Sequence, residues 1–532
     1  MNLQDLIKSN INIIQVITHE DLIIQAMVDK AAFVLERSWY KWNNAIGLQK
    51  YNIQNKSFEK IVEPEGLEDL NTGLLPWFQT NDAHNSIVIV EEFNQSDNNE
   101  DIYLTNIIKQ IYYNKDFKND RALILQQTKK GLPYSLSKKV YQWEIPLPDK
   151  DILAITLASV CKQRSYQINT DDEVIIDEQL HKNIIEASLG LTILDAERAF
   201  NKMITNNIKQ EKEFTEENLN ELILEKESII RNSGYLEYYH HRETLLDIGG
   251  SVALKEWLRQ RQKAFDEKAR EYGLPIPRGL LLIGIPGTGK SLFAKSIGAA
   301  FGQPIIKMDI GKIFAGIVGE SESNMRQALK LVEAISPAVL WIDEIEKGLS
   351  GMASSGATDG GTTSRVLGTF LTWMQEKDKP IFVVATANDI SGLPPEFLRK
   401  GRFDEIFFLD LPNADERKDI IKIHINKNKR NADNFNIDEL VNVSKQFSGA
   451  EIEEAIKEAL FMAYDNGEDI NTEYVKKAIM KTYPLSRTMK EKIESMRKWA
   501  EARAVFASGE KDKQEEISED ISVVKKANNP YI

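Results

Sequence analysis

"GLLLIGIPGTGKS", residues 279–291, runs from an apolar stretch directly into a glycine-rich turn that ends in Lys-Ser. The turn fits the pattern G-x-x-x-x-G-K-[ST] and lies between a predicted strand and a predicted helix, which distinguishes a phosphate-binding loop from an ordinary glycine-rich turn. Lys290 can reach the β and γ phosphates of a nucleotide, and the Ser291 hydroxyl can ligate Mg²⁺. The stretch therefore predicts an α/β domain that binds the phosphates of a nucleotide together with Mg²⁺.

Glycines in this turn allow backbone N–H groups to face inward, at the start of a helix whose dipole adds positive charge. The N–H groups of Gly287, Gly289 and Lys290 are the ones that we expect to face a phosphate. The residues predicted to contact the nucleotide from this loop are Gly284, Pro286, Gly287, Thr288, Gly289, Lys290, Ser291 and Leu292.

A second apolar stretch, "VLWIDE" at residues 339–344, ends in two acids. A strand that ends in acids is a weak signal alone, but beside the phosphate-binding loop it predicts the second half of a nucleotide site. Asp343 would hold Mg²⁺ through water, and Glu344, which points in a different direction, would polarise the attacking water. The pair predicts hydrolysis of the nucleotide and not binding alone.

A third apolar stretch ends in "ATAN", residues 385–388. The Asn388 amide is able to hold a water molecule between Glu344 and the γ-phosphate. Considered alone, an asparagine at the end of a strand more often caps a turn. Both interpretations of Asn388 stay open from the residues themselves.

Two arginines follow in "LRKGRFDE", residues 398–405. Arg399 and Arg402 are three residues apart and lie too far along the chain to serve the phosphate of their own loop. They could project across a subunit boundary as arginine fingers, which contribute about 10³–10⁵ in rate. The alternative is a solvated basic turn, the usual place of a pair of like charges.

Apolar stretches alternate with helical stretches twice along the chain, a pattern typical of parallel α/β sheets. The strands predicted for the first copy are residues 12–18, 86–93, 121–128 and 140–147. The stretches between them with helical spacing are residues 21–39 and 102–113. The strands predicted for the second copy are residues 279–284, 304–310, 338–344, 380–388 and 405–411.

A helical pattern follows each α/β copy, so the chain reads as one plan used twice. The predicted domains are a first α/β domain (1–149), its helical lid (150–235), a second α/β domain (236–412), its helical lid (413–485), and a C-terminal helix with an acidic tail (486–532). The tail from about residue 508 is polar and charged without apolar periodicity, which predicts disorder.

The first copy lacks the residues of a phosphate site. Its turn "VITHEDLII" (16–24) contains no glycine and no lysine, and it has two acids at the start of the helix, which would repel a triphosphate. The strand "VIVEEF" (88–93) ends in Glu91 and Glu92 but has no phosphate-binding loop to serve. We expect a degenerate module with a structural or partner-recruiting role.

The composition of the chain limits which other classes of protein it can belong to. The chain has 532 residues, a net charge of −14 and a pI near 5.2, which argues against general nucleic-acid binding. Cys161 is the single cysteine, so an intrachain disulfide is impossible. No apolar run approaches the roughly 18 residues of a membrane helix, and the N-terminus lacks the design of a signal peptide. We expect a soluble intracellular protein without membrane insertion.

The order of these motifs resembles an AAA ATPase module. The motifs are "DIGG" (247–250), "GIPGTGKS", "GESES" (319–323), "WIDEIEK", "ATAND", "LRKGRFDE" and "SGAEIEEA" (448–455). The chain is similar to the AAA proteins named as hypothetical chloroplast reading frames, from algal plastids and cyanobacteria. The resemblance implies a P-loop AAA module, with a five-stranded parallel sheet and a helical lid. A degenerate AAA-like module with its own lid would precede it.

The resemblance also implies roles for residues outside the loop. Asn388 would be a nucleotide sensor, and Arg399 and Arg402 would be paired arginine fingers in a ring, usually of six subunits. His424 matches a lid histidine that approaches the nucleotide sugar or base, although a buried histidine on an amphipathic lid helix is nearly as good an interpretation. The residues implied to flank adenine are Asp247, Ile248, Gly249, Gly449 and Ala450.

The function expected from this resemblance is ATP hydrolysis in an oligomeric ring, coupled to remodelling of a protein partner that the sequence does not identify. The alternative is a nucleotide-switched regulatory assembly, related to photosynthesis or carbon use, with little threading. The pore-loop candidate is Ile317-Val318-Gly319, which lacks the aromatic residue typical of threading rings, so Ile317 and Val318 either grip a substrate weakly or pack against a neighbouring subunit. The expected location is the cytoplasm, or the plastid stroma if a plastid genome encodes the chain.

Overall fold

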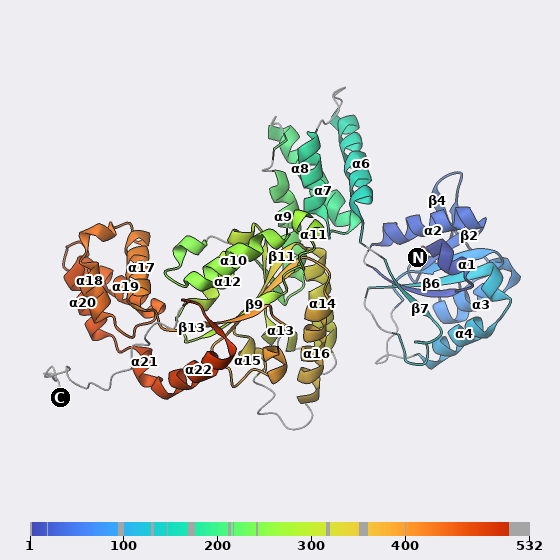
Figure 1. Ribbon diagram of the computed structural model, residues 1–532. Helices are drawn as coiled ribbons and strands as arrows, with labels where there is room; N and C mark the ends of the chain where they lie inside the picture. Colours follow the sequence, from blue (N-terminus) through green and yellow to red (C-terminus); the bar gives the residue numbers. More distant parts are fainter. Residues whose placement is uncertain are drawn as a thin grey trace. The chain divides into compact units, whose positions relative to one another are not determined.

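The computed structural model describes residues 3–509, apart from residues 19, 94–100, 129–131, 146, 169–175, 211–213, 216–217, 241–242, 266, 315–319, 350–359 and 400. These residues form two compact units. The first unit comprises Met1–Asp149 with Thr192–Glu197, and the second comprises Lys150–Leu191 with Arg198–Ile532. Each unit contains a sheet of seven strands (Figure 1).

The sheet of the first unit combines five parallel strands with an antiparallel meander. Its strands are β1 (Ile13–Ile17), β2 (Ser38–Asn43), β3 (Gly47–Asn52), β4 (Ser57–Lys60), β5 (Ser86–Val90), β6 (Arg121–Gln127) and β7 (Tyr141–Glu144). Their order is β4-β3-β2-β5-β6-β1-β7, with parallel pairs from β2 to β7 and antiparallel pairs in β2-β3-β4. All residues of β5 and β6 are buried, as expected for parallel strands covered on both faces.

The four strands predicted for the first copy are β1, β5, β6 and β7, and the meander is an addition that the sequence pattern does not predict. Residues 21–39 have helical spacing, but α2 (Asp21–Leu35) ends earlier, because Glu36 adopts a left-handed backbone with φ 55° and closes the helix. Trp39 is a buried residue of β2. The other helices of this unit are α1 (Leu3–Lys8), α3 (Leu75–Phe78), α4 (Ile102–Tyr113) and α5 (Phe117–Asp120).

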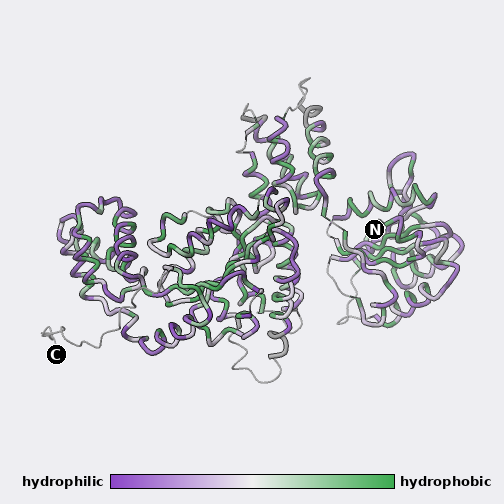
Figure 2. Tube along the Cα trace, in the orientation of Figure 1, coloured by the Kyte–Doolittle hydropathy of each residue, from purple (hydrophilic) through white to green (hydrophobic). Residues whose placement is uncertain are grey.

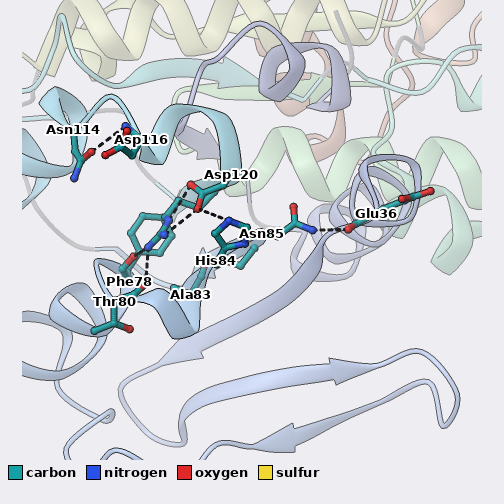
Figure 3. A network of polar contacts seen from close by, with 11 residues as sticks. Glu36, Phe78, Thr80, Ala83, His84, Asn85, Asn114, Asp116 and Asp120 are labelled. Atoms are coloured by element: carbon teal, nitrogen blue, oxygen red, sulfur yellow. Dashed lines mark hydrogen bonds and ion pairs between the residues drawn. The ribbon is translucent and has the colours of Figure 1, made fainter.

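A buried arginine lies at the amino end of the first sheet. Arg121, the first residue of β6, is 4% exposed. Its Nη1 donates to the carbonyl oxygens of Phe78 (2.5 Å) and Thr80 (2.9 Å), and its Nε and Nη2 donate to the carboxylate of Asp120 (3.1 and 2.9 Å). His84 Nε2 lies 3.7 Å from Asp120 Oδ2 in the same network (Figure 3). Parallel α/β sheets bind ligands at the other, carboxyl end of their strands, so this network stabilises the fold.

The second unit contains the predicted five-stranded parallel sheet with one short strand added at each edge. Its strands are β8 (Leu236–Tyr239), β9 (Gly279–Gly284), β10 (Ile305–Met308), β11 (Ala338–Ile342), β12 (Ile381–Ala387), β13 (Glu405–Leu409) and β14 (Val505–Phe506). Their order is β14-β13-β9-β12-β11-β10-β8. At the edges β8 is antiparallel to β10, and β14 is parallel to β13. The predicted α/β fold class is confirmed.

The two sheets have the same connectivity in their parallel parts. Numbered in chain order within each unit, the parallel strands are arranged 5-1-4-3-2, as β7-β1-β6-β5-β2 in the first unit and β13-β9-β12-β11-β10 in the second. In both units an antiparallel strand, β3 or β8, is added beside the second parallel strand. The plan used twice in the sequence is therefore also used twice in the fold.

Helices cover both faces of the second sheet. Leu281 and Ile283 of β9 lie in one apolar cluster with α14 and α16, whereas Leu280 and Leu282 lie in another with α10 and α12. Figure 2 shows hydrophobic residues concentrated along these strands. The helices around this sheet are α10 (Val252–Gln262), α11 (Glu267–Glu271), α12 (Lys290–Phe301), α13 (Ile310–Phe314), α14 (Glu320–Ala334), α15 (Ile345–Leu349) and α16 (Gly360–Glu376).

The remaining helices form two bundles and a C-terminal segment. The helices that precede the second sheet are α6 (Lys150–Ile168), α7 (Glu178–Ser188), α8 (Ile193–Gln210) and α9 (Leu219–Asn232). The lid after it has its own apolar cluster and consists of α17 (Ala414–Lys427), α18 (Ile437–Val443), α19 (Gly449–Asp465) and α20 (Thr472–Lys481). The chain then continues through α21 (Leu485–Thr488) and α22 (Lys490–Arg503) to β14. The tail predicted to be disordered lies outside the described residues from residue 510.

Candidate active site

The glycine-rich loop between β9 and α12 is curled around a buried lysine. Gly287 and Gly289 have φ angles of 81° and 91°, which L side chains rarely adopt, and a Cβ at Gly287 would come within 2.8 Å of Ser448 Oγ. Lys290 is 5% exposed, and its Nζ donates to the carbonyl oxygens of Gly284 (2.9 Å) and Ile285 (2.7 Å). Burial lowers the pKa of Lys290 to about 8, opposed by nearby carboxylates. The loop thus holds a desolvated cation at the start of a helix.

The acid at the end of β11 is bound by two hydroxyl groups. Asp343 Oδ1 accepts hydrogen bonds from Ser291 Oγ (2.9 Å) and from Thr386 Oγ1 (2.6 Å). Thr386 Oγ1 in turn accepts from the backbone N–H of Glu344 (2.9 Å). Sequence reasoning missed Thr386. The signal that could have found it is strand alternation, because Thr386 of β12 is two residues before Asn388, which directly follows the strand.

Glu344 has a strained backbone and a fully engaged carboxylate. Its φ is 49°, a left-handed conformation that costs a non-glycine residue about 1–3 kcal/mol and is found mostly at functional sites. Glu344 Oε1 accepts from Asn388 Nδ2 (2.9 Å), and Oε2 pairs with Lys347 Nζ (2.5 Å). The structure therefore brings Asn388 and Glu344 together, as sequence reasoning expects, and adds Lys347 as a second partner.

Glu346 is a further acid that sequence reasoning did not single out. It is 7% exposed, and its Oε1 accepts a hydrogen bond from the backbone N–H of Asn388 (3.0 Å). Burial raises the pKa of Glu346. This acid positions the residue that holds Glu344.

The lid contacts the loop through the start of α19. The N–H of Ala450 donates to the carbonyl oxygen of Gly287 (3.0 Å). Gly249 packs so closely on lid helix α17 that a Cβ there would come within 2.7 Å of Ile420 Cγ1. Gly249, Thr288, Ile420 and Gly449 line a shared cavity, so four segments distant in sequence enclose one space.

Comparison of the sequence with known protein families identifies similar proteins for three parts of the chain. Residues 280–411 match the ATPase family associated with various cellular activities (AAA). Residues 1–145 match the N-terminal domain of SpoVK-like AAA ATPases, and residues 156–233 match their second domain. An "uncharacterized AAA domain-containing protein ycf46" of Pyropia yezoensis is 38% identical over 523 residues, which cover 95% of this chain and 99% of the relative. The chain is a ycf46-type member of the AAA family.

Two other relatives define the extent of the similarity. The ycf46 protein of Guillardia theta is 40% identical over 390 residues, covering 73% of this chain and 74% of that protein. The cell division cycle protein 48 homolog of Archaeoglobus fulgidus is 32% identical over 222 residues, or 41% of this chain and 30% of that protein. The resemblance to AAA proteins named as chloroplast reading frames, which the motifs indicate, is confirmed. The similarity to ycf46 proteins extends over nearly the whole chain, whereas the similarity to the wider AAA family is restricted to a part.

In this ycf46-type chain the two candidate arginine fingers have different surroundings. Arg399 follows a short 3₁₀ turn and is exposed. Arg402 is half-buried, and its Nη1 donates to the carbonyl oxygen of Leu371 on α16 (2.7 Å). The pore-loop candidates Ile317 and Val318 lie outside the described residues.

Of the residues expected at the adenine, Gly249 and Gly449 line this cavity, whereas the side chains of Asp247 and Ile248 have other contacts. The carboxylate of Asp247 accepts from the backbone N–H of Thr244 (2.8 Å) and pairs with Lys427 of the lid (3.2 Å). These contacts lower the pKa of Asp247, the backbone hydrogen bond most of all. The side chain of Ile248 is buried. Asp247 thus ties the "DIGG" segment to the lid.

His424 lies on α17, one turn after Ile420, and is half-buried. Burial lowers its pKa, which Glu453 on α19 opposes. The charged groups that influence it therefore belong to the lid itself. This surrounding suits a histidine packed within the lid as well as one that approaches a nucleotide.

The residues of this site fit Mg²⁺ bound together with a nucleotide. Mg²⁺ in such sites takes one or two protein ligands and completes its shell with phosphate oxygens and water, and the Ser291 hydroxyl and Asp343 carboxylate already face each other. Among the described residues, no group of three or more His, Cys, Asp or Glu side chains is arranged to hold a metal ion alone. Within the same part of the chain, none of the helices has the length and apolarity needed to span a membrane.

Proposed function

We propose that the chain hydrolyses ATP to ADP and phosphate at the carboxyl end of the second sheet. The observation that carries this proposal is the convergence of a buried lysine, a hydroxyl–carboxylate pair and an amide-held glutamate from three neighbouring strands. These residues are Lys290, Ser291, Asp343, Glu344 and Asn388. A protein that only binds ATP needs the lysine and the loop, whereas Glu344 with its amide partner adds the means of hydrolysis.

Binding begins with the desolvated ammonium of Lys290. The two loop carbonyls that now accept hydrogen bonds from Lys290 are neutral, whereas the β and γ phosphates would supply negatively charged acceptors, which a buried ammonium favours. Backbone N–H groups of the loop would donate to the same phosphates. Mg²⁺, when bound by Ser291 and Asp343, neutralises charge on the phosphate oxygens.

The chemical step uses Glu344 as the proton acceptor. Glu344 takes the proton of the attacking water as the water oxygen bonds to the γ-phosphorus and the bond to the β-phosphate oxygen breaks. The Asn388 amide fixes the direction of the carboxylate through Oε1. Lys347 must leave Oε2 before that oxygen accepts a proton, because its ammonium already occupies it.

The proposal includes a homo-oligomeric ring, usually of six subunits in the AAA family. Arg399 and Arg402 would act on the nucleotide of the adjacent subunit. Arg399 is exposed, whereas Arg402 has to give up its bond to Leu371 before it reaches another chain. Mixing Arg402→Ala chains with Lys290→Ala chains tests the arrangement, since partial recovery of hydrolysis requires an arginine that acts in trans. Verified mixed assemblies without recovery would contradict it.

Hydrolysis in the ring is coupled, in this proposal, to remodelling of a protein partner. The triplet Ile317-Val318-Gly319 supports the alternative of a nucleotide-switched regulatory assembly, because it has no aromatic ring with which to grip a polypeptide. Ile317→Ala that weakens a partner-dependent function and leaves basal hydrolysis unchanged would favour grip. The proposed location is the plastid stroma or the cytoplasm, in line with the plastid origin of the ycf46 relatives.

The decisive experiment uses Glu344→Gln with ATP. We expect this variant to retain ATP and to turn it over at least about 100-fold more slowly, because its neutral amide accepts no proton. Because Glu344→Gln should stay bound to ATP, it can also be used as the bait in a pull-down that identifies the protein partner. The matched control is Glu92→Gln, which changes the corresponding acid of the first sheet and should leave turnover within about twofold. Full turnover by Glu344→Gln would mean that another residue is the base.

A further inference from the structure

The helix that follows the lid does not belong to the lid. α22 buries Ile493, Met496 and Ala500, which are spaced along one helical face, in the apolar cluster formed by β9, β11 and β12. The chain then adds β14 to the sheet beside β13, with Phe407 opposite Val505 and Phe408 opposite Phe506. We call α22, β14 and the next two residues, Ala507 and Ser508, the C-terminal strap. It lies beyond the segment that matches the AAA family model.

The strap holds the hinge between the large sheet and the lid. Arg497 of α22 and Asp410 are each 12% exposed and form a two-pronged pair, with Nε 2.9 Å from Oδ2 and Nη2 2.9 Å from Oδ1. Asp410 directly follows β13, and the lid helix α17 begins at Ala414. A bidentate arginine–carboxylate pair fixes orientation as well as distance. The direction in which the chain leaves the sheet for the lid is therefore set by Arg497.

The strap also fixes the start of α10. The carbonyl oxygen of Ala507 accepts from the N–H groups of Ala253 (3.0 Å) and Leu254 (3.2 Å), and the N–H of Ala507 donates to Phe408 (3.0 Å). The first N–H groups of a helix have no partner within the helix, so Ala507 caps α10. Only Ser251 separates α10 from the "DIGG" segment, which includes Gly249. Through this cap the strap positions one side of the cavity.

Ala507 and Ser508 reach the cavity itself. They line it together with Gly249, Thr288 and Gly449, which come from the "DIGG" segment, the phosphate-binding loop and the lid. We propose that the C-terminal strap forms part of the base end of the nucleotide site, with Ala507 and Ser508 in its wall and Arg497 as a positioning residue at the hinge. The inference rests on the proposed function. It adds that the strap determines the affinity for the nucleotide, whereas the chemical step depends on the residues of the candidate active site.

The strap provides its own matched control. Lys492 of α22 also pairs with the large domain, through Asp389 at 2.7 Å, but both side chains are more exposed, 42% and 33%. An exposed ion pair contributes little, because solvent screens it and two side chains must be ordered. Lys492→Met therefore removes a strap charge without removing the hinge contact.

The test measures binding of a fluorescent, slowly hydrolysed ATP analogue and steady-state hydrolysis by the full chain. Arg497→Met should raise the Kd of the probe and the KM for ATP about 10-fold and leave kcat within about threefold, whereas Lys492→Met should change each by less than about twofold. Arg497→Lys, which keeps the charge but not the two-pronged geometry, should give an intermediate Kd. A drop in kcat with unchanged Kd, or no change in either, would overturn the proposal.

A second variant guards against loss of folding in Arg497→Met. Ser508→Phe places a ring at a half-buried position in the cavity wall and should also weaken probe binding about 10-fold or more, with an unchanged unfolding midpoint. Equal binding by Ser508→Phe and the wild type would contradict the place of the strap in the site. Probe binding by a wild-type chain that does not turn ATP over would contradict the proposed function alone, so the two failures are distinguishable.

Discussion

The third parallel strand of each sheet ends in a pair of acids, Glu91 and Glu92 after β5, and Asp343 and Glu344 after β11. The second acid of each pair has a left-handed backbone, with φ 54° at Glu92 and 49° at Glu344. The same strained conformation thus occurs at the same place in two units with different side chains around it. The two units therefore share even the φ angle of this residue. They differ in the hydrogen-bond partners of the first acid of each pair.

In the first unit the acid is satisfied by neutral groups of its own chain. Glu91 Oε1 accepts from Gln25 Nε2 (3.1 Å), and Oε2 accepts from Asn43 Nδ2 (2.9 Å). In the second unit Asp343 meets the Ser291 hydroxyl, and a buried ammonium, Lys290, lies nearby. The first arrangement is complete without a ligand. The second contains a desolvated cation for which a phosphate is the better acceptor.

The turn after the first strand shows the same contrast. In the second unit the lid helix α19 donates its Ala450 N–H to the carbonyl of Gly287 in the loop. In the first unit α8 begins with a cap formed by Thr192 and Asp195, and its Leu194 N–H donates to Glu20 Oε1 (3.0 Å). The start of the lid helix therefore meets a backbone carbonyl of the loop in the second unit, whereas the start of α8 meets a side-chain carboxylate of the turn in the first unit.

The largest test of this comparison is Lys290→Ala. We expect nucleotide binding to fall by about 100-fold or more, because at least two hydrogen bonds between charged groups are lost. Isothermal titration should give one nucleotide per chain for the wild type and none for the variant, with Glu20→Gln as a control that leaves both affinity and stoichiometry unchanged. Binding by Lys290→Ala with the affinity and stoichiometry of the wild type would show that the site of the second unit does not hold the nucleotide, and would break the contrast.

Asn388→Ala should have the next largest effect. The variant removes the amide that orients Glu344, so kcat is expected to fall about 10- to 100-fold with KM changed by less than about threefold. Phosphate release at saturating ATP measures it. A raised KM with unchanged kcat would show that Asn388 contributes to binding and not to the orientation of the base.

Lys290→Met should make the nucleotide-free protein more stable by about 1–2 kcal/mol, because it removes a buried charge. The pKa of Lys290 is lowered to about 8, so its favourable contribution to stability is complete above pH 10.5 and is lost as the pH falls through 8. The advantage of the variant is therefore largest below pH 8 and shrinks toward pH 10.5. Chemical unfolding at several pH values measures it. A variant less stable than the wild type at pH 7 would mean that the two loop hydrogen bonds of Lys290 outweigh its burial.

The smallest expected effect is that of Glu20→Ala in the first unit. Loss of the carboxylate at the start of α8 should cost about 1 kcal/mol locally, whereas Glu20→Gln, which keeps an acceptor oxygen, should cost less. Hydrogen exchange at the Leu194 amide reads this contact directly, because it reports local opening. Unchanged exchange in Glu20→Ala would show that Glu20 does not hold the start of α8.

Much of the second unit could be predicted from sequence. Its parallel strands are continuous apolar runs, and the loop pattern together with the acids after β11 predicts which side chains meet at the carboxyl end. Thr386 was missed because a hydroxyl within a buried strand is not distinctive in sequence. The meander β2–β4 was missed because Trp39 continues the helical spacing of α2, and only the left-handed Glu36 ends that helix.

The helix α22 of the strap could be predicted from the sequence, but strand β14 and the position of Ala507 and Ser508 at the cavity could not. Its apolar face is visible in the sequence, yet the spacing of Ile493, Met496 and Ala500 does not say which surface they cover. The pairing of Arg497 with Asp410 joins residues 87 positions apart, and nothing local in either segment indicates it. Contacts of this range depend on the assembled fold.

The packing of α22 on the large domain has a mechanical consequence. The chain enters the lid after β13 and leaves it into α22, whose Lys492 pairs with Asp389 just after β12, so both attachments of the lid lie at the carboxyl end of the sheet. A body fastened at two adjacent points turns most easily about the line that joins them. We therefore expect the lid to rotate about one defined axis. The ion pair of Arg497 with Asp410 fixes the chain at one end of that axis.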